Sequence, residues 1–110
     1  AALVDVNKAS LQDLLNNPSY DVVFKVQLGA YNSALNENNN MYKRKNISYE
    51  IERNTNSMLR YMSADSFKDA TQAKNLAHEA QRKGIRNAFV AVYVNGQRLE
   101  KSLEDFEKNR

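Results

Sequence analysis

The same order of secondary-structure elements occurs twice along this chain. Residues 22–53 and residues 58–94 each have the pattern of a strand, a helix and a second strand, with apolar residues at every second position in the strands and every third or fourth in the helices. The predicted elements are strands at 22–29, 47–53, 58–62 and 88–94 and helices at 32–45 and 69–83. A β-α-β-β-α-β chain folds as a four-stranded antiparallel sheet with both helices on one face. We therefore expect an α+β, RNP-like or ferredoxin-like fold.

Two further short helices are predicted, one at each end of the duplicated region. The first covers residues 9–16 and the second about 99–108, where Leu99, Leu103 and Phe106 form one stripe. The expected division is an N-terminal helical extension at 1–21, a main domain at 22–96 and a C-terminal helix at 97–110. Each end helix either extends the support of the sheet or lies across its open face.

Composition is that of a globular domain with no strong bias. Of the 110 residues, 42% are hydrophobic and 26% are charged, which argues against extensive disorder. The net charge of +3 is mild and interspersed, so it permits an anionic partner without requiring one. The absence of cysteine excludes thiol catalysis, disulfides and thiolate metal sites.

Membrane and targeting signals are missing from the sequence as given. No apolar run approaches the roughly 20 residues of a membrane span, and no signal peptide opens the chain. We expect no direct membrane insertion. Because the numbering starts inside what reads as folded sequence, we expect this chain to be one piece of a longer protein.

The face of the sheet opposite the helices has an unusual polar row. In "FKVQLGAY" the apolar row of Phe24, Val26 and Leu28 alternates with Lys25, Gln27 and Gly29. The third predicted strand adds further residues to that face, namely Arg60 and Met62. Because this row places the primary amide of Gln27 near Gly29, which has no side chain, we expect the face to have a functional role.

Catalytic patterns are absent. The only histidine, His78, is followed by Glu79, and adjacent helical residues do not face each other. Glu50 and Glu52 share a strand face and have the spacing of an acid/base pair, but such pairs more often mark a solvated face. No Ser/His/Asp set, phosphate loop or metal-ligand spacing occurs. We predict a module without catalytic activity, cofactor or metal.

An RNA-binding module is one alternative, because the same topology serves that family. The stretch "NAFVAVY" is similar to the RNP1 signature, but its glycine and two of its aromatic positions are missing. It also falls on the last strand, and that family carries the signature on the third. We expect no nucleic acid partner.

A closer resemblance is to the SPOR domain family. "FKVQLGAY" followed by Asn32-Ser33 resembles the family's opening, V-Q-x-G-[AS]-F and a small polar residue. "SFKDATQAKNLAHEAQRKGIRNAFV" resembles its second repeat, with an alanine-rich helix and a glycine before the final strand. "AFVAVYVNGQRL" is similar to the ending common in Bacteroidetes members. The match covers about residues 22–99. The second repeat of the family normally has a glycine before its aromatic residue, and "MSADSF" has none here.

The resemblance implies a binding module and not an enzyme. SPOR domains bind bacterial peptidoglycan, favour glycan strands stripped of their stem peptides, and direct proteins to division sites. It therefore implies glycan strands as the partner, location in the periplasm or cell envelope, and a monomer. A diverged domain of the same fold could instead bind another protein, and that alternative stays open.

The resemblance also implies which residues would bind the glycan. The family's glutamine matches Gln27, whose amide can both donate to and accept from an N-acetyl group, and its small polar residue matches Asn32 or Ser33. The remaining candidates come from the chemistry of a glycan: Lys25 and Arg60 for muramic acid carboxylates, Gly29 for close approach of a sugar, Tyr93 or Phe89 beneath a sugar ring, and Met62. For Gly29 a turn or bulge is the alternative role, and for Met62, Phe89 and Tyr93 it is packing in the core. For Gln27, Lys25 and Arg60 the alternative is an ordinary position on the solvated surface.

Overall fold

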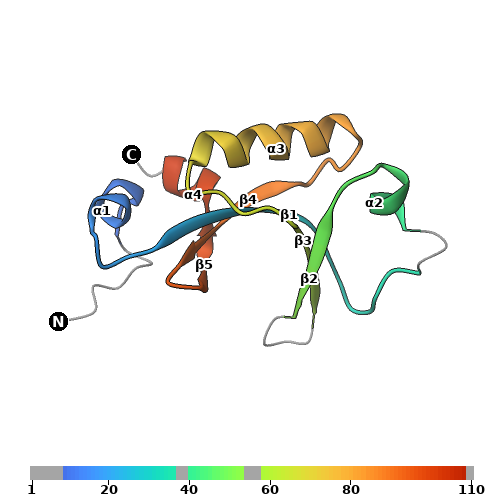
Figure 1. The fold of residues 1–110 in the computed structure, drawn as a ribbon, viewed down its shortest axis with the longest axis horizontal. Coiled ribbons are helices and arrows are strands. Elements are labelled where there is room, and N and C mark those ends of the chain that lie inside the picture. The colour runs from blue at the N-terminus through green and yellow to red at the C-terminus, as the bar shows by residue number, and fades with distance from the viewer. Residues whose placement is uncertain (1–8, 37–39, 54–57, 109–110) are drawn as a thin grey trace.

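A five-stranded antiparallel sheet forms the centre of the molecule (Figure 1). The computed structural model describes residues 9–36, 40–53 and 58–108. The strand order is β2-β3-β1-β4-β5. The strands are β1 (Val22–Tyr31), β2 (Tyr49–Arg53), β3 (Leu59–Ser63), β4 (Phe89–Val94) and β5 (Gln97–Ser102), and the helices are α1 (Leu11–Asn16), α2 (Met41–Arg44), α3 (Ala70–Arg82) and α4 (Leu103–Lys108). The predicted α+β class with an antiparallel sheet is confirmed, while the number of strands and the helices differ in detail.

The fifth strand replaces the first half of the predicted C-terminal helix. Asn95 and Gly96 have φ angles of 52° and 82°, the left-handed region that a two-residue hairpin turn requires. This turn pairs Val94 with Gln97 and aligns β5 on β4. Helix α4 begins only at Leu103. The prediction of a helix starting at Leu99 was wrong. Leu99, Leu103 and Phe106 have helical spacing, but Leu99 is a buried residue of β5 and Leu103 a buried residue of α4.

The helix predicted at 32–45 is much shorter in the structure. Residues 32–36 are not helical, residues 37–39 lie outside the described part, and α2 comprises four residues. The side chain of Asn40 accepts hydrogen bonds from the amides of Tyr42 and Lys43 and so starts the helix. Asparagine side chains compete for backbone groups and favour caps over helix interiors, which explains why the Asn-rich stretch begins a helix and does not continue one.

Helix α3 is confirmed close to its predicted bounds. Asp69 caps its first turn by accepting a hydrogen bond from the Thr71 amide at 2.9 Å. Gly84, with φ of +100°, ends it, and the Ile85 amide then donates to the Ala80 carbonyl. Small alanines at helical spacing are buried, which lets this helix lie close against the sheet. In Figure 1 it runs along one side of the sheet.

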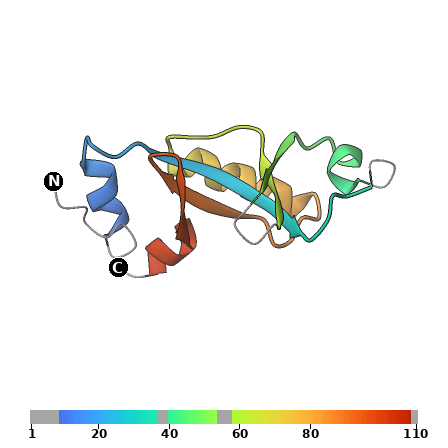
Figure 2. The same cartoon turned by 90° about the horizontal axis from the view of Figure 1, so that it is seen from below.

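The main core lies between the sheet and α3 and includes residues of α1 and α4. Phe24, Val26 and Leu28 of β1 point into it, as their alternation predicted. Leu14 of α1 and Leu103 and Phe106 of α4 belong to the same core. The end helices thus extend the support of the sheet. Helices α1 and α4 lie toward the same end of the molecule, and α2 lies at the other (Figures 1 and 2).

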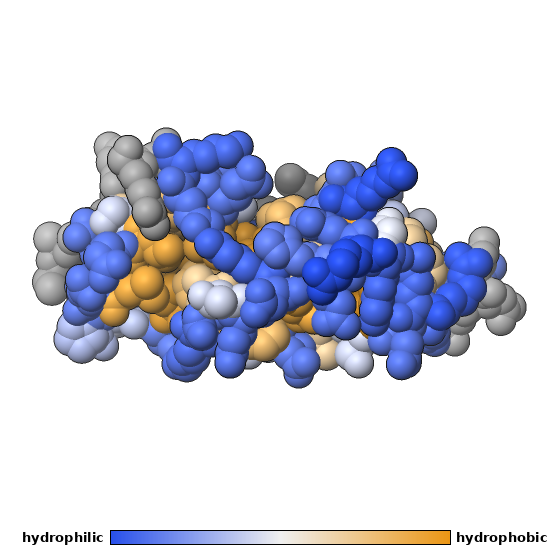
Figure 3. Space-filling view, turned by 90° about the horizontal axis from the view of Figure 1, so that it is seen from above, coloured by the Kyte–Doolittle hydropathy of each residue, from blue (hydrophilic) through white to orange (hydrophobic). Residues whose placement is uncertain are grey.

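Most of the surface on the α3 side is hydrophilic. Figure 3 shows this side, where an apolar strip appears toward the end that carries α1 and α4. Among the described residues, Leu15 of α1 is one of the large apolar side chains that are exposed. The candidate binding residues that lie on the other face of the sheet are Lys25, Gln27, Arg60, Met62 and Tyr93. Gly29 was predicted there too, but the bulge places it opposite Tyr61 of the main core.

Candidate functional site

The face of the sheet opposite α3 is strongly curled. Strands β2, β3 and β5 turn away from α3 in Figure 1. The curl brings β4 against β2, because the Tyr93 hydroxyl donates to the Glu52 carboxylate at 2.8 and 3.0 Å to its two oxygens. Strands about 4.8 Å apart would hold side chains of β2 and β4 well beyond this distance in a flat sheet. This face is therefore a concave surface lined by side chains that contact one another.

Two of the predicted cations on this face have carboxylate partners within the chain. Lys25 Nζ lies 2.6 Å from Glu50 Oε1, and Arg60 Nη1 lies 3.7 Å from Glu52 Oε1. The antiparallel register of β2 on β3 places Glu50 opposite Met62 and Glu52 opposite Arg60. The predicted contact of Lys25 and Arg60 with glycan carboxylates stays a prediction, and it requires these cations to exchange or share their partners.

Met62 and Tyr93 form a second, small core on the concave face. Met62 has an exposed fraction of 0% and packs with Ala91 and Tyr93. Tyr93 is 8% exposed, and Lys25 Nζ lies 5.6 Å from its ring centroid. Both side chains therefore have the packing role that was the alternative for them. In this conformation Met62 has no surface to offer a glycan, and Tyr93 has little.

Gln27 is at the centre of the concave face. In the sheet it pairs with Met62 on one side and with Phe89 on the other. Its Oε1 is buried and accepts no hydrogen bond from any residue in the described part of the chain. A buried acceptor without a donor costs about 1–3 kcal/mol of stability. Such a group in a folded protein needs a donor from outside the chain, either an ordered water or a ligand.

Gly29 has a structural requirement of its own. The ladder between β1 and β3 shifts register between Gln27 and Gly29, which is a bulge. A Cβ at Gly29 would overlap Tyr42 Oη and would come within 2.7 Å of Tyr31 Oη. These two hydroxyls are hydrogen bonded to each other at 2.8 Å. Room for the tyrosine pair is thus sufficient reason for this glycine, and sugar approach stays a prediction.

Asn32 and Ser33 are exposed directly after β1. No hydrogen bond between either side chain and another described residue is present in the structure. They stand beyond the end of the strand that carries Gln27, so a long ligand following β1 would reach them. Nothing in the geometry distinguishes one from the other.

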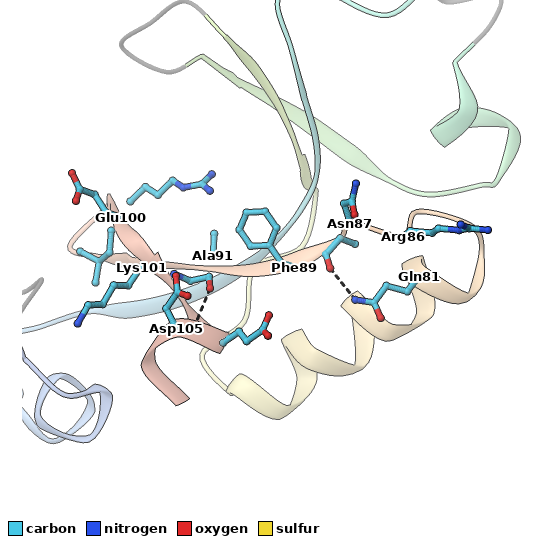
Figure 4. A pocket seen from close by; sticks show the side chains of 13 residues that line it. Gln81, Arg86, Asn87, Phe89, Ala91, Glu100, Lys101 and Asp105 are labelled. Atoms are coloured by element: carbon cyan, nitrogen blue, oxygen red, sulfur yellow. Dashed lines mark hydrogen bonds between the residues drawn. The ribbon is translucent and has the colours of Figure 1, made fainter. Parts of the chain in front are cut away.

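Two grooves flank Phe89 and share it as a wall. The first, which we call the β1 groove, has a volume of about 430 Å³ and is lined by Gln27, Gly29, Tyr31, Tyr42, Arg86 and Phe89, among others. The second, the β5 groove, has a volume of about 480 Å³ and is lined by Arg86, Asn87, Phe89, Ala91, Arg98 and Lys101, among others. Figure 4 shows Phe89 and Ala91 projecting from β4 to the same side, and Gln81 on α3 below them. Together the grooves could accommodate an extended ligand.

Arg98 is a candidate that the sequence prediction missed. It lies on β5 opposite Tyr93, its Cζ is 5.8 Å from the Phe89 ring centroid, and its Nη1 donates to Met62 Sδ at 3.9 Å. Burial lowers the pKa of its guanidinium, as does the nearby charge of Arg60. The signal was present in "NGQR", since a strand after the Asn-Gly turn would have aligned this arginine with β4.

Other functional patterns find no support among the described residues. His78 is exposed on α3 and lines a hollow between α3 and α4, with Lys74 and Glu107, that shares Phe89 with the β5 groove. No group of three or more histidine and acidic residues within the described ranges is arranged to hold a metal ion. None of the helices described is long and apolar enough to cross a membrane.

Comparison with known proteins identifies no relative. No protein-family model, curated protein or solved structure matches this chain.

Proposed function

We propose that this chain is a SPOR-like binding module for the glycan strands of bacterial peptidoglycan, without catalytic activity, and that it directs its parent protein to the cell wall. The proposal combines the motif resemblance around "FKVQLGAY" with the position of its glutamine. Gln27 lies on the concave face and lines the β1 groove, beside Phe89. A location in the periplasm or cell envelope follows from such a ligand.

The observation that carries the proposal is the unpaired Oε1 of Gln27. Peptidoglycan sugars carry N-acetyl groups, whose amide N–H is a donor for this oxygen. The same amide group presents a carbonyl that the Gln27 NH₂ can donate to. Because Oε1 itself is buried, a ligand in the β1 groove reaches it only when the Gln27 side-chain amide rotates toward the groove, and it then satisfies an acceptor that the fold leaves without a donor. Folding alone gives no such reason for a glutamine here.

The test compares binding and stability in the same variants. Gln27→Ala should have a free energy of unfolding equal to that of the parent or higher by up to about 1–3 kcal/mol, because it removes an unsatisfied buried acceptor. Its binding to amidase-treated sacculi should weaken by about 1–3 kcal/mol, the contribution of lost hydrogen bonds to a desolvated amide. Gln72→Ala is the matched control, since Gln72 is exposed on α3. Co-sedimentation and thermal melts measure both effects.

Two outcomes would contradict the proposal. Equal sedimentation of Gln27→Ala and the parent with amidase-treated sacculi would remove Gln27 from the site. Failure of the parent to bind any sacculi would leave the protein-binding alternative.

The salt dependence of binding distinguishes a glycan ligand from an RNA ligand. Glycan carboxylates are sparse, and Lys25 already has a carboxylate partner in the chain. Raising salt from about 50 to 200 mM should therefore weaken binding by far less than the roughly 10³-fold seen when several phosphates are contacted. Steep salt dependence with tight binding of single-stranded RNA would favour the RNA-binding alternative instead.

A further inference from the structure

Arg98 is held in place by contacts that leave its charge without a direct ion pair among the described residues, although the Glu52 carboxylate acts on it from a longer distance. The guanidinium lies over the Phe89 ring and donates to the Met62 sulfur. Within the described part of the chain it forms no ion pair, whereas Lys25, Arg60 and Lys74 each do. A partly desolvated cation without a counter-ion binds an added anion more strongly than a hydrated one does. The side chain lines the β5 groove, so an added anion has access to it.

The acidic side chains of the same groove are engaged elsewhere or exposed. Asp105 Oδ2 accepts a hydrogen bond from the Ser102 amide at 3.0 Å, which starts α4. Glu104 pairs with Lys108 at 3.2 Å, and Glu100 is exposed to solvent. Glu52, on the concave face, is already bound by Tyr93 and Arg60. None of these carboxylates is within ion-pair distance of Arg98.

Gln27, Phe89 and Arg98 come from three adjacent strands. Gln27 of β1 pairs with Phe89 of β4, and the guanidinium of Arg98, from β5, reaches the Phe89 ring. Neighbouring strands are about 4.8 Å apart, so an amide group and a guanidinium flank one aromatic ring. Muramic acid carries its N-acetyl group and its lactyl carboxylate on neighbouring ring carbons. One such sugar therefore carries a partner for the Gln27 amide and a partner for the Arg98 guanidinium.

We infer that Arg98 binds the lactyl carboxylate of a muramic acid residue whose N-acetyl group is bound by Gln27. The inference rests on the proposed function and adds to it the sugar and the group that are recognised. Arginine suits this role because its planar fork binds a carboxylate through two parallel hydrogen bonds. Phe89 holds the guanidinium at the boundary of the two grooves.

The test changes the ligand and the protein in parallel. Amidase-treated glycan strands are used as prepared and after reduction of their carboxyl groups to alcohols with carbodiimide and borohydride. Binding of the parent should weaken by about tenfold or more on reduction, roughly the effect of one hydrogen bond to a charged group. Arg98→Gln should bind the native glycan about tenfold more weakly and should be insensitive to reduction. Arg82→Gln, an exposed arginine on α3, should behave like the parent.

The outcomes distinguish this inference from the proposed function. If the parent binds native and reduced glycan equally well, or if Arg98→Gln retains the full effect of reduction, the inference is wrong and glycan binding stands. If the parent binds neither glycan, both are wrong. Should Arg98→Gln not fold, Arg98→Lys, which keeps the charge but not the fork, takes its place: it should bind native glycan with intermediate strength and lose less on reduction than the parent does, and an undiminished loss would contradict the inference.

Discussion

Tyr93 of β4 donates its hydroxyl to both carboxylate oxygens of Glu52 on β2, although β3 and β1 lie between these strands in the sheet. The contact holds the curl that forms the concave face. Tyr93→Phe should lower the free energy of unfolding by about 1.5–3 kcal/mol, the range for a hydrogen bond to a charged group. Urea denaturation measures it. Tyr20→Phe is the control, because no side-chain hydrogen bond of Tyr20 to a described residue is present, and equal losses would contradict the role given to this contact.

Alkaline pH should destabilise the protein through its buried tyrosines. Burial raises the pKa of Tyr93, with the hydrogen bond to Glu52 adding to the effect, and burial raises the pKa of Tyr42, which is bonded to Tyr31. The unfolded chain loses these protons from about pH 10, while the folded chain keeps them. The contribution of these two tyrosines to the free energy of unfolding is therefore constant below about pH 10 and falls as the pH rises further. Melting temperatures between pH 8 and pH 11 should fall less steeply for Tyr93→Phe than for the parent. Equal slopes of melting temperature against pH for Tyr93→Phe and the parent would contradict the assignment of this effect to Tyr93.

Gly29→Ala should destabilise the fold even without any ligand. The added Cβ overlaps Tyr42 Oη, so one of the two tyrosines has to move. Overpacking of this kind costs about 1–3 kcal/mol. Adding Tyr42→Phe should recover part of the loss, since it removes the nearest atom. A normal melt for Gly29→Ala would show that the glycine is not required by packing and would leave sugar approach as its reason.

Ending the chain after Gly96 should unfold the domain or leave it poorly soluble. The predicted boundary at 96 would separate the core from Leu99, Leu103 and Phe106, all of which are buried in it. It would also expose the edge of β4, which pairs with β5. Circular dichroism and size-exclusion chromatography of residues 1–96 beside the full chain measure the effect. A folded, monomeric truncated chain would support the original boundary.

Local patterns in the sequence determined the parts of the fold that depend on near neighbours. Alternation placed Phe24, Val26 and Leu28 in the main core and Gln27 on the opposite face, and both are confirmed. The capping residue Asp69 and the glycine at position 84 bounded α3, because helix ends are set by hydrogen bonds within a few residues. The antiparallel α+β class followed from the order of these elements.

Contacts between residues distant in the chain decided the rest. Gln97–Ser102 is a strand because it completes the sheet beside β4, although Leu99, Leu103 and Phe106 fit a helix locally. The curl joins Tyr93 to Glu52 over the buried Met62. The pairing of β2 with β3 gives Arg60 its internal partner, and the pairing of β5 with β4 brings Arg98 to Phe89. No alternation or motif specifies a bend of this kind, since it is the sum of twist and side-chain packing over several strands. Gln27 could therefore be found from the sequence. The Asn-Gly turn could have aligned Arg98 with β4, but only the structure shows that its guanidinium reaches the Phe89 ring.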